Sequence, residues 1–494
     1  MAIINIVNMS FAYDGGTPLF SNISLKIDTH WKLGLIGRNG RGKTTLLRLL
    51  LGDLVCDGKI DIPVPVGYFP YTVQDKTPST LEIAEQITNF ELWQFERELS
   101  LLEVSGNILM RPFETLSDGE QSKVMLAVLF LNDNHFLLID EPTNHLDLEG
   151  RNIVGNYLNK KNGFILVSHD RTLLDRSVDH ILSINRNSVE LMQGNFSTWQ
   201  CNQNYREQFE DAENNRLKKE VRRLQEATRQ STEWSNKTEK EKYGHGPVDR
   251  GFIGSKAAKI MKHAKSIENR KQKTIEQKQL LFKNTEITEK LSIMPIRFHS
   301  TRLIDLENIF VQYNDGIPLF DGVTFSVEAG DRVAVCGRNG CGKSSLLKLI
   351  AGQDIPYQGY YCVPKNLTIS YLPQNASFLR GSMRDFIIQR QIDESLLKTI
   401  LHKLGFPRDD YENDMSDFSA GQKKKVLLAA SLCEQVHLYL WDEPLNYIDI
   451  ISRTQIMNLL IEYHPTLIFV EHDKIFLETI ATKKIDLLTT TSDR

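Results

Sequence analysis

The sequence predicts an α/β fold in which two repeated domains are joined by a long antiparallel α-helical hairpin. Three observations predict it. Motifs recur in the same order about 300 residues apart, short apolar segments lead into glycine loops and helical patterns, and a charged segment with helical spacing separates the two copies. The chain has 494 residues, of which 41% are hydrophobic and 25% charged, a composition ordinary for globular domains.

The internal repeat is the strongest of these observations. A glycine loop at Gly37–Thr44 returns at Gly337–Ser344, and Tyr13 returns as Tyr313, both at an offset of 300. Three further segments return at offsets of 302 or 303: Leu116–Glu120 as Phe418–Gln422, Ile139–Pro142 as Trp441–Pro444, and Ser168–Asp170 as Glu471–Asp473. Five features in one order indicate a duplication, with a first repeat at 1–203, a linker at 204–290 and a second repeat at 291–494.

Each repeat has the pattern of a parallel sheet. Apolar segments enter the glycine loops at Leu33–Ile36 and Val333–Val335, and helical patterns follow the loops. Four continuous apolar runs predict strands that are buried on both faces: Phe136–Ile139, Phe164–Val167, Leu438–Trp441 and Leu467–Val470. Strand, glycine loop and helix in this order predict helices on both faces of the sheet.

The linker is predicted to form two antiparallel helices. Side chains from Tyr205 to Ser231 and from Ile260 to Leu281 repeat at helical spacing, and the turn-forming cluster Gly244–Gly251 lies between them. The tip is therefore expected at about 244–256. A helix from Tyr205 to Tyr243 would be about 58 Å long, at ~1.5 Å per residue.

Charge separates the linker from the rest of the chain. Between Arg206 and Lys283 there are 20 basic and 12 acidic residues, a net charge of +8, so that the remainder carries −12 of the total of −4. From Arg250 to Lys283 the ratio is 10 to 2. On charge alone, a partner with a phosphate backbone and a solvated helical spacer are equally good interpretations.

Several classes of protein are disfavoured by composition. The six cysteines form no CxxC pair, so a zinc site or a disulfide framework is not expected and a reducing compartment is implied. The N-terminus lacks the pattern of a signal peptide. The longest apolar candidate, Val426–Trp441, is interrupted by Glu434, so no membrane helix is expected. These features predict a cytoplasmic protein.

The glycine loops point to nucleotide binding. They fit GxxxxGK[ST], in which glycines let backbone N–H groups turn toward phosphate oxygens. Lys43 or Lys343 would reach the β- and γ-phosphates, and Thr44 or Ser344 would hold Mg²⁺. A chain of this length contains one such match by chance about 2% of the time. Two matches, each between a strand and a helix, favour binding strongly.

Acidic and histidine residues follow the predicted strands. Asp140 and Asp442 are suited to the Mg²⁺ shell, and the adjacent Glu141 and Glu443 to orienting or deprotonating the attacking water. A structural role for these carboxylates is the less favoured alternative. The histidines in register with them, which could contact the γ-phosphate, are His169 and His472.

The segments Ser117–Glu120 and Ser419–Gln422 allow two compatible interpretations. Each has the spacing of a capping box before a helix. A helix N-terminus that carries a serine hydroxyl is also an anion site. It could therefore grip the γ-phosphate of a nucleotide held by the other repeat.

Taken together, these motifs resemble the ATP-binding-cassette superfamily. Twin cassettes with a charged helical linker and no membrane domain resemble the ABC-F group of translation-associated ATPases. Segment Glu141–Asp147 is typical of that group, and Asp442–Asp449 with the linker tip Asp249–Lys259 is similar to the Lsa-type resistance branch. The resemblance implies ATP and Mg²⁺ as cofactors, and head-to-tail closure of the two cassettes over two ATP molecules within a monomer.

The resemblance also implies a partner and a function. Members of this branch bind the ribosomal E site beside P-site tRNA, with the linker directed toward the peptidyl-transferase centre. Lsa-like members displace lincosamides, streptogramin A and pleuromutilins. The alternatives are a housekeeping translation factor and, less favoured because of the basic linker, the ATPase subunit of a drug exporter.

The expected site residues follow from the motifs. Those expected to bind ATP are Tyr13, Gly37, Arg38, Asn39, Gly40, Arg41, Gly42, Lys43, Thr44, Thr45, Ser117, Gly119, Glu120, Tyr313, Gly337, Arg338, Asn339, Gly340, Cys341, Gly342, Lys343, Ser344, Ser345, Ser419, Gly421 and Gln422. Mg²⁺ is expected at Thr44, Asp140, Ser344, Gln374 and Asp442. Expected RNA or drug-site contacts are Lys240, Lys242, Arg250, Phe252, Lys256, Lys259 and Lys262. For Phe252, packing against its own hairpin is the alternative to a contact with an unpaired base.

Two departures from the family pattern predict unequal sites. The second repeat has Gln374 where a glutamine joins the Mg²⁺ or water shell, but the first repeat has Tyr71 there. The first signature has Asp118 where glycine is usual, which places a carboxylate near an incoming phosphate. The Tyr71 departure belongs to the site of Lys43 and Ser419, and the Asp118 departure to the site of Lys343 and Ser117. We expect slow turnover.

Overall fold

A computed structural model of the chain describes residues 2–206 and 291–487, apart from positions 14, 16, 17, 72, 133, 145, 186, 187, 294 and 314–317, together with residues 208, 209, 212, 216 and 266. The chain divides into two compact units, Met1–Phe196 with Thr288–Arg494 and Ser197–Ile287. Apart from those few positions, the predicted helical hairpin lies outside the described residues, as do its tip and its seven expected contact residues.

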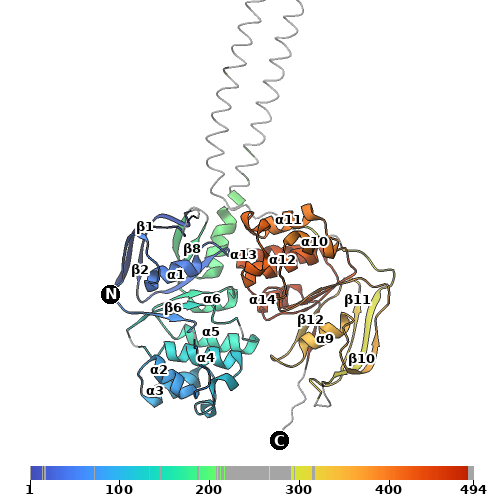
Figure 1. Cartoon of the computed structure of the whole chain (residues 1–494), viewed down its shortest axis with the longest axis horizontal. Coiled ribbons are helices and arrows are strands. Elements are labelled where there is room, and N and C mark those ends of the chain that lie inside the picture. Colours follow the sequence, from blue (N-terminus) through green and yellow to red (C-terminus); the bar gives the residue numbers. More distant parts are fainter. Residues whose placement is uncertain are drawn as a thin grey trace, which may run out of the picture. The chain divides into compact units, whose positions relative to one another are not determined.

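The first repeat contains two sheets (Figure 1). An antiparallel sheet has the order β2-β1-β4, and a six-stranded sheet has the order β5-β6-β7-β3-β8-β9. In the larger sheet β9 is antiparallel to β8 and the other pairs are parallel. The strands are β1 (Ile3–Phe11), β2 (Phe20–Asp28), β3 (Lys32–Gly37), β4 (Asp57–Asp61), β5 (Val66–Phe69), β6 (Phe136–Asp140), β7 (Phe164–Val167), β8 (His180–Ile184) and β9 (Val189–Gln193).

The helices of the first repeat lie between these strands. They are α1 (Lys43–Leu51), α2 (Thr80–Ile87), α3 (Leu92–Leu101), α4 (Asp118–Leu129), α5 (Leu148–Asn159) and α6 (Arg171–Ser177), with short 3₁₀ turns η1 (Gly106–Ile108) and η2 (Phe113–Thr115). In Figure 1, α2, α3 and α4 gather at the end of the repeat away from β1 and β2. The repeat therefore has a helical part and an antiparallel part on either side of the parallel sheet.

The second repeat follows the same plan. Its sheets have the orders β11-β10-β13 and β14-β15-β16-β12-β17, and the second of these is parallel. The strands are β10 (Arg302–Val311), β11 (Val323–Glu328), β12 (Arg332–Cys336), β13 (Tyr357–Cys362), β14 (Ile369–Leu372), β15 (Leu438–Asp442), β16 (Leu467–Val470) and β17 (Lys483–Asp486). The helices are α9 (Lys343–Ile350), α10 (Met383–Arg390), α11 (Glu394–Lys403), α12 (Ala420–Cys433), α13 (Ile450–Tyr463) and α14 (Lys474–Ile480), with η3 (Asp409–Glu412) and η4 (Met415–Asp417).

The central strands are buried on both faces, as their unbroken apolar runs predict. In β15, Tyr439 and Trp441 pack into one hydrophobic cluster, whereas Leu438 and Leu440 pack into another on the opposite face. Side chains on a strand alternate between faces, so both faces must be covered by other elements. The parallel register then brings the carboxyl ends of neighbouring strands to one edge, for example Asp442 beside Val470. Functional residues of open α/β sheets collect at this edge.

Candidate functional site

Both glycine loops lead from a strand of the parallel sheet into a helix. Gly42 and Gly342 precede α1 and α9 with φ angles of 88° and 95°, a left-handed conformation that favours glycine. A Cβ on Gly42 would lie 2.7 Å from the Leu19 side chain. The backbone can therefore wrap closely only because these residues lack side chains.

The loop lysines fold back over their own loops. The Lys43 ammonium donates to the carbonyl oxygens of Gly37 at 2.8 Å and Arg38 at 3.2 Å. Lys343 makes the equivalent contacts with Gly337 at 2.8 Å and Arg338 at 3.0 Å. Burial lowers the pKa of Lys43, while Asp449, Glu141 and Asp140 oppose that change. Each loop thus encloses a buried cation at a helix N-terminus, which is an arrangement that binds phosphate.

The expected tyrosines lie beside these loops. The Tyr13 hydroxyl lies 2.9 Å from the Thr45 hydroxyl, and Tyr313 donates to Ser345 at 3.1 Å. Both rings remain about half exposed, at 52% and 41%. An exposed ring anchored next to a phosphate loop provides a surface on which a nucleotide base can stack.

The strand-end aspartates are buried and suited to a divalent cation. Thr44 donates to Asp140 Oδ2 at 2.9 Å. Asp442 is 1% exposed, and neither of its carboxylate oxygens has a hydrogen-bond partner among the described residues. Burial raises the pKa of both aspartates. A buried carboxylate with two free oxygens is costly unless a cation or ordered water completes it, so this position fits Mg²⁺.

The glutamates that follow these aspartates share an unusual backbone conformation. Glu141 and Glu443 have φ angles of 51° and 48°, whereas non-glycine residues rarely adopt positive φ. Their N–H groups donate to Val167 and Val470 at 2.9 and 3.0 Å. Strain repeated at both strand ends indicates that the fold holds these two carboxylates in a special orientation.

Each glutamate faces the expected histidine. The distance from His169 Nε2 to Glu141 Oε1 is 3.5 Å, and from His472 Nε2 to Glu443 Oε1 it is 3.6 Å. Burial, together with the charges of Lys43 and Arg453, lowers the pKa of His169 well below its usual value. The structure therefore places each predicted glutamate beside the predicted histidine of its own repeat, a pairing that the sequence did not predict.

The two signature segments begin helices α4 and α12. Ser117 with Glu120, and Ser419 with Gln422, form complete capping boxes, which confirms that interpretation of their spacing. Gly119 and Gly421 lie in the first turns of these helices.

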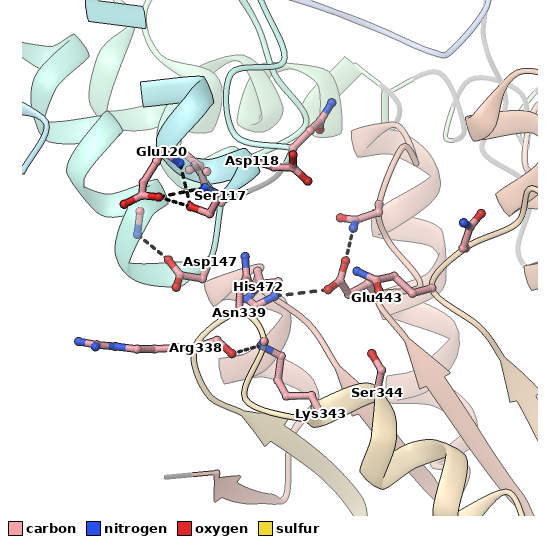
Figure 2. Close-up of a pocket in the computed structure, with 18 of the residues that line it drawn as sticks. Ser117, Asp118, Glu120, Asp147, Arg338, Asn339, Lys343, Ser344, Glu443 and His472 are labelled. Carbon is pink, nitrogen blue, oxygen red and sulfur yellow. Dashed lines mark hydrogen bonds and ion pairs between the residues drawn. The ribbon is translucent and has the colours of Figure 1, made fainter. Parts of the chain in front are cut away.

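The first signature faces the loop of the second repeat across a large cleft (Figure 2). The cleft has a volume of about 1680 Å³ and is lined by Ser117–Glu120 of one repeat and by Lys343–Ser345 of the other. Gln374, Glu443 and His472 also line it. Residues predicted from distant parts of the sequence thus surround one cavity.

At the other loop the two repeats are in direct contact. The Asn39 amide donates to the carbonyl oxygen of Tyr447 at 2.7 Å, and a Cβ on Gly421 would lie 3.2 Å from that amide nitrogen. The Arg171 guanidinium donates to the hydroxyl of Thr454. The loop of Lys43 therefore lies against the second signature, as the head-to-tail arrangement requires.

A family model described as ABC transporter matches residues 20–144 and 320–446, which together make up half of the chain. The chain belongs to the ABC transporter family. Both matched segments run from before a glycine loop to just beyond the strand-end glutamate. The chain is thus an ATPase with two ABC domains, as the motifs predicted.

Similar proteins narrow this ABC ATPase to the ABC-F group. The ribosome protection protein VmlR of Bacillus subtilis (strain 168) is 28% identical over 98% of this chain and 86% of its own length. The probable ATP-binding protein YheS of Escherichia coli (strain K12) is 28% identical over 94% of the chain and 76% of its own length. Among the described residues, no helix is both long and apolar enough to cross a bilayer.

Solved structures support the ABC fold. A model of ribosome-bound archaeal Pelota and ABCE1 contains a chain that matches with a TM-score of 0.62 at 20% identity, over 97% of this chain and 76% of that one. An archaeal ribosome recycling factor aABCE1 in complex with stalk protein aP1 matches with a TM-score of 0.61 at 17% identity, over 97% and 87%.

The two ATP sites of this ABC protein differ in electrostatics. Burial raises the pKa of Glu141 to about 7, and the Asp140 charge acts in the same direction. For Glu443, burial also acts to raise the pKa. The His472 ring, the Gln374 amide and the Lys343 charge outweigh burial and lower the pKa to about 2. At neutral pH Glu443 is ionised and able to accept a proton, whereas Glu141 is partly protonated.

The segments that carry Gln374 and Tyr71 differ as well. Gln374 lines the cleft with Glu443. Tyr71 instead lines a separate cavity of about 550 Å³ with Arg48 and Tyr68. The Tyr68 hydroxyl points to Asp140 Oδ2 at 3.5 Å. The second repeat has Tyr371 at the equivalent position, and the charge of Asp442 acts on it, so this tyrosine is common to both repeats.

Sequence reasoning missed several residues at the sites. Asn446 donates to Glu443, and the carbonyl of Tyr447 receives Asn39 of the other repeat. Lys424 and Glu471 are buried beside the second site. Lys424 stands in the run Lys423–Lys425, which has the composition of a solvated helix face, and the sequence carries no signal that the middle lysine is buried.

Proposed function

We propose that this chain is an ATP-dependent ribosome-protection protein. The observation that carries the proposal is its similarity to the ribosome protection protein VmlR over 98% of the chain. The basic segment Arg206–Lys283, with its excess of eight positive charges, supports it because such a segment suits an RNA backbone.

In this proposal, ATP closes the two repeats and the closed form binds the ribosomal E site beside P-site tRNA. The linker then dislodges lincosamides, streptogramin A or pleuromutilins near the peptidyl-transferase centre, with Phe252 and the six basic linker residues as contacts. Ribosome binding places the protein in the cytoplasm.

Different side chains have different roles at each proposed ATP site. Thr44 with Asp140, and Ser344 with Asp442 and Gln374, would hold Mg²⁺, which would withdraw charge from the phosphates. Lys43 and Lys343 bind the phosphates, and the opposite signature completes the site. Glu141 and Glu443 orient a water molecule and accept its proton, and His169 and His472 fix the position of these carboxylates.

The test is drug tolerance in a sensitive host. The wild-type chain is expected to raise tolerance to the three drug classes and to sediment with ribosomes. The double variant Glu141→Gln/Glu443→Gln is expected to stay bound to ribosomes with a filled E site. Glu394→Gln, an exposed carboxylate on α11, is the matched control. Unchanged tolerance together with sedimentation in the membrane fraction would favour an exporter subunit instead.

The linker contact is tested separately. Phe252→Ala is expected to lower drug tolerance while ATP hydrolysis stays unchanged. Unchanged tolerance with unchanged ribosome binding would remove Phe252 from the proposal. Ribosome binding without any change in drug tolerance in the wild type would favour a housekeeping translation factor.

A further inference from the structure

Lys424 on α12 is a buried lysine that the known motifs do not explain. It is 1% exposed. Its ammonium donates to the carbonyl oxygens of Pro373 at 2.9 Å and Gln374 at 3.2 Å, in the segment after β14. A third bond, of 3.1 Å, reaches the carbonyl of Asp442 at the end of β15. One cation therefore joins the signature helix to both segments that supply the second site.

Glu471 is a buried carboxylate that, like Lys424, holds backbone groups around the second site. It is 4% exposed, and its Oε1 accepts the N–H of Leu445 at 2.7 Å. Its Oε2 accepts the N–H of His472 at 3.0 Å. Glu471 thus fixes the backbone just after Glu443 and the backbone of the histidine that faces it.

Burial disfavours the charged forms of both Lys424 and Glu471. Burial lowers the pKa of Lys424 to about 8, and Glu471 is the carboxylate that opposes this change most, followed by Asp442 and Glu443. A buried charge whose partner is removed is strongly destabilising. Burial raises the pKa of Glu471, and the charge of Arg453 opposes that change most. Lys424, Glu471 and Arg453 therefore belong to one cluster of buried charges.

The first repeat has serines at both positions. Ser122 corresponds to Lys424, and its hydroxyl donates to the carbonyl of Asp118 in its own helix at 2.8 Å. Ser168 corresponds to Glu471 and accepts the N–H of Asp170 at 3.1 Å. Both buried charges thus occur together in the second repeat and neither occurs in the first.

We propose that Lys424 is a positioning residue for ATP hydrolysis in the second repeat, together with Glu471, which holds the backbone of Leu445 and His472. Lys424 holds the backbone of Gln374 and Asp442 so that the Gln374 amide and the Glu443 carboxylate point into the cleft. Gln374, Lys424 and Glu443 all line that cleft. The inference depends on ATPase activity alone, and ribosome binding does not enter it.

The experiment measures ATP hydrolysis by the full chain in a Glu141→Gln background, which isolates the site of Glu443. Lys424→Met, which keeps the length of the side chain and removes its charge, is expected to lower kcat by about tenfold and to change KM by less than about threefold. Lys424→Arg keeps the charge and is expected to restore most of the kcat. Lys398→Met, an exposed lysine on α11, is the control and is expected to match the parent.

A double variant tests whether the two residues act together. Lys424→Met/Glu471→Gln is expected to lose less activity than the two single losses multiplied, because both side chains hold backbone segments of the same site. Thermal unfolding checks each protein. If Lys424→Met does not fold, Lys424→Arg, Glu471→Gln and the double variant carry the test. A kcat within twofold of the parent, a loss that appears in KM alone, or no rescue by arginine in a folded protein would overturn the proposal.

Discussion

The two ATP sites share a backbone plan and differ in the chemistry that surrounds it. Glu141 and Glu443 have nearly the same positive φ and nearly the same distance to a histidine. The pKa of Glu141, however, is raised to about 7, whereas that of Glu443 is lowered to about 2. Equal motifs therefore do not imply equal sites.

The difference comes from the residues around each glutamate. The second repeat supplies Gln374 and the buried Lys424 and Glu471, and Asn446 donates to Glu443. The first repeat directs Tyr71 into another cavity. We infer that the second repeat hydrolyses ATP faster and that the first holds it longer.

The largest expected effect comes from the catalytic glutamates. Glu443→Gln is expected to lower single-turnover hydrolysis at its site by about a thousandfold, since a general base contributes on that scale. It is also expected to lower the steady-state rate of the chain more than Glu141→Gln does. The two variants are compared by phosphate release under identical conditions. Equal residual rates would contradict the ranking of the sites.

A stability comparison sharpens the contrast between the repeats. Lys425 is 3% exposed and pairs with the fully buried Asp449 at 2.8 Å, and although burial raises the pKa of Asp449, the lysine holds it well below its usual value. Lys425→Met leaves that carboxylate unpaired and is expected to cost about 3–5 kcal/mol of unfolding free energy. Lys123→Met, at the equivalent half-buried position, is expected to cost less than about 1 kcal/mol.

Urea denaturation of the full chain measures both variants, and the buried Trp441 provides a fluorescent probe in the second repeat. Similar midpoints for the two would show that the buried pair adds nothing to the second repeat.

Substitution of Gln374 is expected to have the next largest effect on hydrolysis. Gln374→Ala is expected to lower kcat at the second site by about tenfold, because its amide lines the cleft and helps to keep Glu443 ionised. Tyr71→Ala is expected to change kcat at the first site by less than about twofold. Gln374→Ala is measured in the Glu141→Gln background, and Tyr71→Ala is measured in the Glu443→Gln background. A large loss in Tyr71→Ala would mean that this ring acts on the ATP site.

The smallest effect is a difference in pH dependence. A base works when it is deprotonated, so kcat/KM of the first site is expected to rise several-fold as the pH increases through about 7, the pKa of Glu141. With a pKa of about 2, Glu443 stays ionised, and kcat/KM of the second site is expected to be flat between pH 6 and 8. Each profile is recorded in the variant that silences the other site. Parallel profiles would contradict the difference in pKa.

Sequence patterns predicted the parts of the fold that depend on burial and spacing. The run Phe136–Ile139 became β6 with one further residue, and the glycine loops lie where GxxxxGK[ST] places them. The left-handed backbone of Glu141 could not be predicted, because it depends on the neighbouring strand. The burial of Lys424 could not be predicted either, because its three carbonyl partners come from segments 18 to 51 residues away.

A single-turnover measurement with radiolabelled ATP on the wild-type chain tests the inequality of the sites most directly. We expect two phases of similar amplitude, about one ATP per chain in each, because each site holds one nucleotide. The faster phase is lost in Glu443→Gln and the slower in Glu141→Gln. One exponential phase that consumes both nucleotides, and that either substitution slows equally, would contradict this expectation.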